Sequence, residues 1–103
     1  MSKYVLRWKA NLPAWPTDPA AVLSVWEGAI RGGNHMISNG TFSEVCWTSN
    51  IEGFAMMEAA SIEAALGAAA MFFPFFINEI HEAIPWERGV AAVLASAKAV
   101  AGQ

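Results

Sequence analysis

Apolar and polar residues alternate at the start of the chain and then change to a helical spacing. Residues 3–10 predict a strand whose two faces are Tyr4, Leu6 and Trp8 on one side and Val5, Arg7 and Lys9 on the other. A proline-rich loop follows and ends at Asp18, which suits the N-cap of a helix with Pro19 at its first position. Apolar residues then recur every three or four positions as far as Asn39-Gly40, a typical helix end. The pattern predicts one helix over 19–38, although a break at Gly32-Gly33 is an alternative.

The middle of the chain predicts a hairpin and a second helix. Residues 41–49 alternate as a strand, with Phe42, Glu44 and Cys46 on one face and Val45 and Trp47 on the other. After a short connection, residues 54–59 predict the returning strand. Ser61 is then expected to cap a helix that Pro74 ends or kinks. Its expected buried stripe is Ile62, Ala65, Leu66, Ala69 and Phe73.

The last part of the chain predicts a fourth strand over 77–86 and an alanine-rich helix over 87–102. The order of elements is therefore β-α-β-β-α-β with one additional helix. This order predicts an α+β fold of the ferredoxin-like type, in which a four-stranded antiparallel sheet carries two helices on one face. Residues 1–103 are expected to form a single domain, with the ferredoxin-like core in 3–86.

Composition bears on the face of the sheet that the helices leave open. Of the 103 residues, 55% are hydrophobic and only 15% are charged, against about 25% charged in a typical soluble domain. The predicted strands also carry apolar residues on both faces. We therefore expect the sheet of a second copy to cover the open face, which would make a dimeric α/β barrel, as a homodimer or a multiple of it.

The most apolar segment, Ala64 to Ile77, raises the question of a membrane. It is fourteen residues long and includes four phenylalanines, whereas a spanning helix needs about 20 residues. We therefore expect it in a core, pocket or subunit contact, with no membrane partner. Six scattered basic residues and a net charge of −3 argue against nucleic acid. The N-terminal residues lack signal-peptide features, so a cytoplasmic location is expected.

Three segments resemble the muconolactone isomerase-like proteins of the dimeric α/β-barrel superfamily. They are the ANLP at 10–13 before a long helix, the GFAMMEAASIEAAL at 53–66, and the FFPFFINEIHEAIP at 72–85. The resemblance extends over about residues 3 to 86. It implies a homodimer, or an assembly of dimers, with an apolar pocket between sheet and helices and no cofactor. It also suggests cofactor-independent, isomerase- or cyclase-like chemistry on an apolar carbonyl or lactone compound.

Two groups of side chains are candidates for chemistry. His81 lies on the predicted last strand with Glu79 on the same face, an arrangement that suits a general base; the alternative is a hydrogen bond across a dimer interface. A metal at this pair would need a third ligand, so none is expected. Arg7, expected to be buried, needs either a carboxylate such as Glu44 or the carboxylate of a substrate.

Bulky residues form a pool from which a ligand pocket could be built. Its expected members are Trp8, Trp26, His35, Trp47, Met56, Phe72, Phe73 and Phe76. Most of these residues could equally serve core packing, and His35 could simply favour the last turn of its helix. Three functions therefore compete: a small enzyme, a non-catalytic binder of a hydrophobic metabolite, and an accessory subunit that meets another protein.

Overall fold

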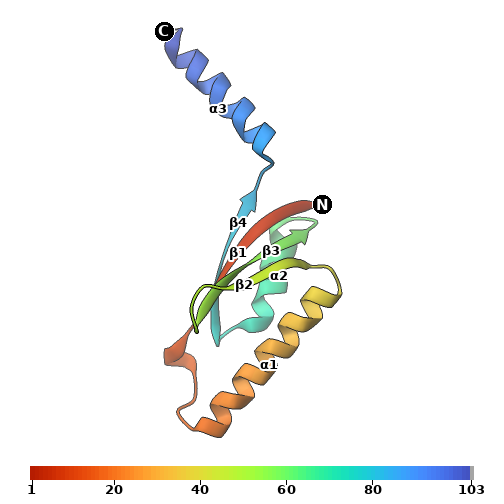
Figure 1. Ribbon diagram of the computed structural model, residues 1–103, viewed down its shortest axis with the longest axis vertical. Helices are drawn as coiled ribbons and strands as arrows, with labels where there is room; N and C mark the ends of the chain where they lie inside the picture. The colour runs from red at the N-terminus through yellow and green to blue at the C-terminus, as the bar shows by residue number, and fades with distance from the viewer. Residues whose placement is uncertain (103) are drawn as a thin grey trace.

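The computed structural model describes residues 1–102, and its elements follow the predicted order (Figure 1). They are β1 (Ser2–Ala10), the 3-10 turn η1 (Leu12–Ala14), α1 (Pro19–Ser38), β2 (Phe42–Trp47), β3 (Glu52–Ala59), α2 (Ile62–Ala69), the 3-10 turn η2 (Ala70–Phe72), β4 (Phe76–Ala83) and α3 (Trp86–Ala101). The fold is α+β, as predicted. The long helix α1 runs without a break through its two adjacent glycines.

The four strands form one antiparallel sheet in the order β2-β3-β1-β4, which is compatible with a ferredoxin-like fold. Helices α1 and α2 lie on the same side of this sheet (Figure 1). The core lies between them and the sheet, and its most deeply buried large side chains are Leu6 and Met57, which are 2% and 1% exposed. The other side of the sheet, called the open face below, is covered by no helix of residues 1–102.

Local signals at the helix ends are confirmed. The Asp18 carboxylate accepts a hydrogen bond of 3.1 Å from the Ala21 amide, and Pro19 occupies the first helical position of α1. The Ser61 hydroxyl accepts one of 3.1 Å from the Ala64 amide and begins α2 in the same way. Gly40 has a φ of +83°, a left-handed conformation that side-chain-bearing residues rarely adopt, and it stops α1 before β2.

The face that α2 turns toward the sheet differs from the prediction. Ala65 and Ala69 are buried and Ala68 is half-buried, whereas Leu66 and Phe73 are 55% and 75% exposed. The physical reason is size, because a face made of alanines brings the helix closer to the sheet than leucine and phenylalanine would allow. Two larger apolar side chains, Ile62 and Leu66, are left on the outer surface of α2.

A bulge in β2 also changes which residues share a face. The register passes from Phe42 opposite Met57 to Glu44 opposite Met56, so one additional residue lies between them. Phe42 therefore lies on the helix-covered face with Val45 and Trp47, and not with Glu44 and Cys46 as simple alternation predicted.

The last helix, α3, projects away from the rest of the molecule (Figure 1). The radius of gyration is 17.6 Å, compared with about 13 Å for a compact chain of about 100 residues. The apolar residues exposed on α3 include Trp86 at 81% and Val93 at 67%. No helix within residues 1–102 combines the length and the apolar character needed to cross a bilayer.

Gly53 provides a direct test of packing within the sheet. A β-carbon there would lie 2.5 Å from Trp8 Cζ2 and closer still to the Cys46 carbonyl oxygen. We expect Gly53→Ala to lower the free energy of unfolding by about 1–3 kcal/mol, because the backbone or Trp8 must move. Urea denaturation measures the change. Gly67→Ala on α2 is the control, since no atom lies within 4 Å of its added carbon; an equal loss in both variants would contradict the expectation.

Candidate functional site

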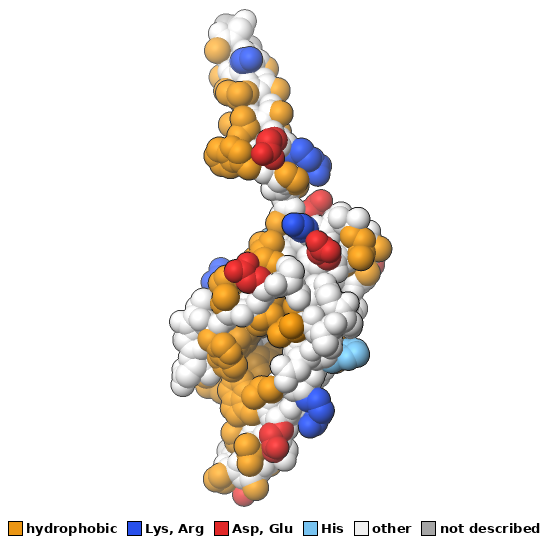
Figure 2. Space-filling view, turned by 45° about the vertical axis from the view of Figure 1, so that its right-hand side comes forward, with side chains coloured by type: hydrophobic (Ala, Val, Ile, Leu, Met, Phe, Trp, Pro, Cys, Tyr) orange, Lys and Arg blue, Asp and Glu red, His pale blue; other side chains and the backbone are white. Residues whose placement is uncertain are grey.

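An apolar cleft of about 240 Å³ lies between α1 and the helix-covered face of the sheet. Figure 2 shows a hollow in the body of the molecule where hydrophobic side chains gather. The cleft is lined by Leu6, Trp8, Trp26, Ala29, Ile30, Gly33, Asn34, Ile37, Phe42, Val45, Trp47, Phe72, Phe76 and Asn78. Residues from α1, η2 and three of the four strands thus form one concave surface.

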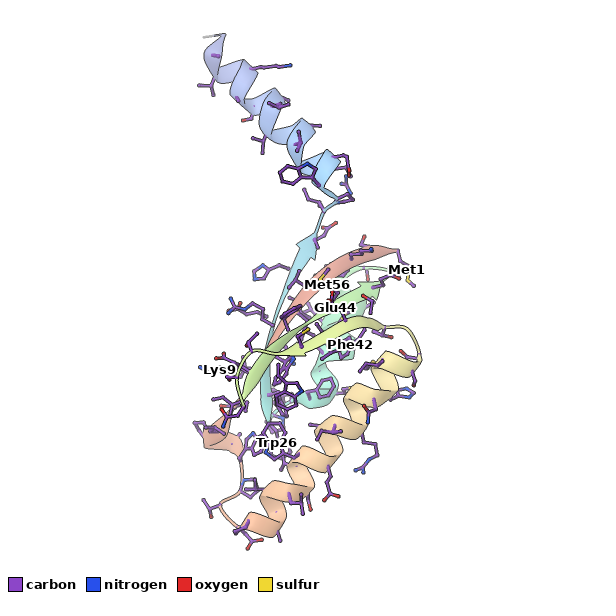
Figure 3. The ribbon with its side chains drawn as sticks, in the orientation of Figure 1. Met1, Lys9, Trp26, Phe42, Glu44 and Met56 are labelled. Carbon is purple, nitrogen blue, oxygen red and sulfur yellow. The ribbon has the colours of Figure 1, made fainter. Side chains whose placement is uncertain are left out.

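Aromatic side chains set the distance between α1 and the sheet. The ring of Trp26, on α1, lies 5.7 Å from the rings of both Trp47 and Phe76, measured between centroids. Trp26 and Phe42 both lie in the space between the helix and the strands (Figure 3). Such large side chains hold the helix off the sheet, and none of the twenty residues of α1 is fully buried. The cleft is the space that remains between them.

The floor of the cleft is built around Gly53. Trp8 on β1 and Trp47 on β2 both lie directly opposite Gly53 on β3, from its two sides. Because Gly53 has no side chain, the two indoles meet above it at 4.8 Å between centroids, edge to face at 90°. This is a favourable geometry for an aromatic pair. It fixes Trp8 while Trp47, which is 56% exposed, reaches the cleft from the edge strand.

One end of the cleft is held by the loop after β1. The Trp15 indole N–H donates a hydrogen bond of 2.7 Å to the Phe75 carbonyl oxygen. The Asn11 side-chain amide donates one of 3.1 Å to the Pro74 carbonyl oxygen. The Trp15 ring also packs on Trp26 at 4.8 Å between centroids. The loop, α1 and the phenylalanine-rich turn are thereby tied together.

The polar groups of the cleft are few and neutral. Of the fourteen lining residues that the structure describes, none has a titratable side chain, and the only amides are Asn34 and Asn78. Asn78 is half-buried, and its Nδ2 donates a hydrogen bond of 3.2 Å to the carbonyl oxygen of Ala69, the last residue of α2. The lining is chemically suited to an uncharged apolar molecule, and none of these fourteen residues is an acid, a base or a nucleophile.

The predicted catalytic residues lie together on the open face, on the other side of the sheet. The His81 Nε2 atom is 3.7 Å from Glu79 Oε2, and their side chains are 71% and 65% exposed. Arg7 is also exposed and lies directly opposite Glu79 across β1 and β4. The expectation that Arg7 is buried is therefore wrong for the single chain. Its suggested partner Glu44 lies on β2, with β3 between that strand and β1.

The predicted pocket residues divide between the cleft and other surfaces. Five of them line the cleft: Trp8, Trp26, Trp47, Phe72 and Phe76. Met56 lies on the open face opposite Val5, Phe73 is 75% exposed outside the cleft, and His35 is exposed in the last turn of α1.

The sequence analysis did not identify Asn78 or Gly33 as part of the site. Asn78 lies between Phe76 and Ile80 in the alternation of β4, so the sequence already indicated a polar residue on the inward face of this strand. Gly33 shares the apolar stripe of α1, and no atom lies within 4 Å of a β-carbon built on it. Neither position could be assigned to a cleft before the distance between helix and sheet was known.

No known protein-family model matches the chain, and no curated protein matches its sequence. Within residues 1–102, no group of three or more His, Cys, Asp or Glu side chains lies close enough together to hold a metal ion. The fold and the cleft themselves are therefore the basis for any functional inference.

Replacing Trp15 tests how firmly the end of the cleft is held. Trp15→Phe removes the hydrogen bond to the Phe75 carbonyl and leaves part of the indole's space empty. We expect the free energy of unfolding to fall by about 1–3 kcal/mol. Leu23→Ala, at a 59% exposed position on α1, should change it by less than about 0.5 kcal/mol. Chemical denaturation of both variants checks this, and two equal losses would argue against a structural role for Trp15.

Proposed function

We propose that this protein binds a small, uncharged, flat apolar molecule in the cleft between α1 and the sheet, without turning it over. The observation that carries the proposal is the lining itself: three indoles, three phenyl rings and aliphatic side chains around two neutral amides. Ligand sites are commonly apolar and concave with a few polar groups. A charged ligand would lose its hydration there without gaining an opposite charge.

The size of the cleft limits the ligand. An apolar cavity of about 150 Å³ accommodates one benzene ring. The volume here is about 240 Å³, which suits a molecule of about two fused rings. Aromatic rings of a ligand could stack on or pack edge-on to Trp8, Trp26 and Trp47, of which Trp47 already packs edge to face on Trp8 and at a tilt of 42° on Trp26.

Binding is favoured over isomerase-like catalysis because of where the titratable groups lie. Catalysis by His81, Glu79 and Arg7 on a carbonyl or lactone compound would have to occur on the open face, where all three side chains are exposed. The sheet separates these residues from the cleft. A ligand held against Trp8 and Phe76 could not reach them.

A naphthalene titration followed by ¹H–¹⁵N NMR tests the binding proposal. We expect the indole N–H signals of Trp8, Trp26 and Trp47 to shift in a saturable way, while that of the exposed Trp86 stays fixed. Gly33→Leu should abolish the shifts, because Gly33 lines the cleft and the introduced leucine side chain would occupy the open space there. Gly67→Leu makes the same change on α2, away from the cleft, and should bind normally. Absence of saturation in the unmodified protein would refute the proposal.

We further propose that the chain is a ferredoxin-like homodimer whose open faces meet as a dimeric α/β barrel. Four half-buried apolar side chains, Val5, Cys46, Phe54 and Met56, form a patch in the middle of this face. Around the patch, each basic residue of β1 lies opposite a glutamate: Lys3 opposite Glu58, Arg7 opposite Glu79 and Lys9 opposite Glu52. Opposite charges at neighbouring positions can pair when a second sheet covers them, which would lower the cost of burying them.

The projecting helix α3 also favours association. An isolated helix of about this length is only marginally stable in water, and its apolar side contacts little of its own chain. We propose that the apolar side of α3 packs on the second copy, which would bury the apolar residues that remain exposed in a single chain.

Light scattering coupled to size-exclusion chromatography tests the dimer. The expected mass is twice the 11.1 kDa of one chain. Met56→Lys places a charge in the centre of the patch and should shift the protein to monomer, at least at micromolar concentration. Leu66→Lys, at a 55% exposed position on the outer face of α2, should leave the dimer intact. A monomeric unmodified protein would overturn this part of the proposal.

A further inference from the structure

The amide of Asn78 has a fixed orientation, which determines the hydrogen bond that the cleft can make. Its side-chain nitrogen carries two N–H donors, and its oxygen only accepts. The carbonyl oxygen of Ala69, 3.2 Å away, can only accept, so the atom facing it must be the nitrogen. That carbonyl lies at the junction of α2 and η2. Asn78 therefore ties β4 to this junction through its nitrogen, and its oxygen is left free of this contact.

From this orientation we infer that the cleft selects an aromatic ligand bearing a hydrogen-bond donor, such as a phenol-type hydroxyl, which the Asn78 Oδ1 atom accepts. The inference rests on the proposed function and adds the chemical class of the ligand. Asn78 lies directly opposite Trp8 on β1 and two residues from Phe76, and all three residues line the cleft. Asn34, the other amide in the lining, is exposed on α1 and is solvated without a ligand.

The same arrangement disfavours anions. A carboxylate would meet an acceptor oxygen at Asn78, and none of the fourteen lining residues supplies a positive charge. An aromatic acid of the right size should therefore bind much more weakly than the corresponding phenol. An ether of the same ring system would fit but would leave the Asn78 oxygen without a donor, which costs more than a normal hydrogen bond contributes.

Three naphthalene derivatives separate these possibilities: 2-naphthol, 2-methoxynaphthalene and 2-naphthoate, each titrated into the full chain and followed by NMR. We expect 2-naphthol to bind about 2- to 12-fold more tightly than the methoxy compound, the range that one neutral hydrogen bond supplies. This preference would oppose hydrophobicity, because the additional methyl group favours burial of the ether. The naphthoate should bind about 10-fold or more weakly than the naphthol.

Two variants assign the preference to one residue. Asn78→Leu removes the acceptor and should make the methoxy compound bind at least as tightly as the naphthol. Asn34→Leu is the matched control and should retain the preference for the naphthol. The comparison of ligands on the unmodified protein decides the inference even if Asn78→Leu fails to fold. Equal binding of naphthol and ether, or tight binding of the naphthoate, would overturn the inference and leave the proposed function standing. Failure of both neutral compounds to bind would instead remove the proposed function.

Discussion

The unequal thickness of the two helix–sheet contacts is the constraint on which the rest of this structure depends. Helix α2 meets the sheet through Ala65 and Ala69, which are 0% and 4% exposed, and so it lies close. Helix α1 meets it through Trp26, whose ring lies 5.7 Å between centroids from the rings of Trp47 and Phe76 on the strands. Two helices on one sheet face cannot differ so much in spacing without leaving a gap beside the more distant one. The cleft is that gap.

Glycine and tryptophan act together in this arrangement. Gly53 leaves room for the Trp8 ring, and Gly32 lets α1 approach Phe72, with 3.3 Å between a built β-carbon and the Phe72 ring. Gly53 therefore admits a large side chain over the sheet, and Gly32 allows α1 to lie close to η2. The helix contacts η2 directly at Gly32 and is separated from the strands at Trp26 by aromatic rings.

Much of the fold could be predicted because its signals are local. Asp18-Pro19, Ser61 and Asn39-Gly40 define helix ends through hydrogen bonds and backbone angles that involve only neighbouring residues. The bulge in β2 could not be predicted, since nothing in TFSEVCWTS distinguishes Ser43 from its neighbours. The buried side of α2 was predicted only in part: Ala65 and Ala69 are buried as expected, whereas Ile62 and Leu66 have the right spacing but are too large for a close contact. Five of the eight expected pocket residues line the cleft, and strand position explains the exception of Met56: on β3 it falls on the opposite face from Ala55 and Met57.

Alternation along the strands gives the two surfaces of the sheet different side chains. Along β1, Leu6 and Trp8 line the cleft, while Arg7 between them lies on the open face opposite Glu79. One chain is enough to form the cleft, so the proposed binding does not require the proposed dimer, and two associated chains would hold two independent sites. The open face, in contrast, presents opposite charges at neighbouring positions around an apolar patch. The two proposals can therefore be tested separately, because the side chains on which each depends point to opposite sides of the same strands.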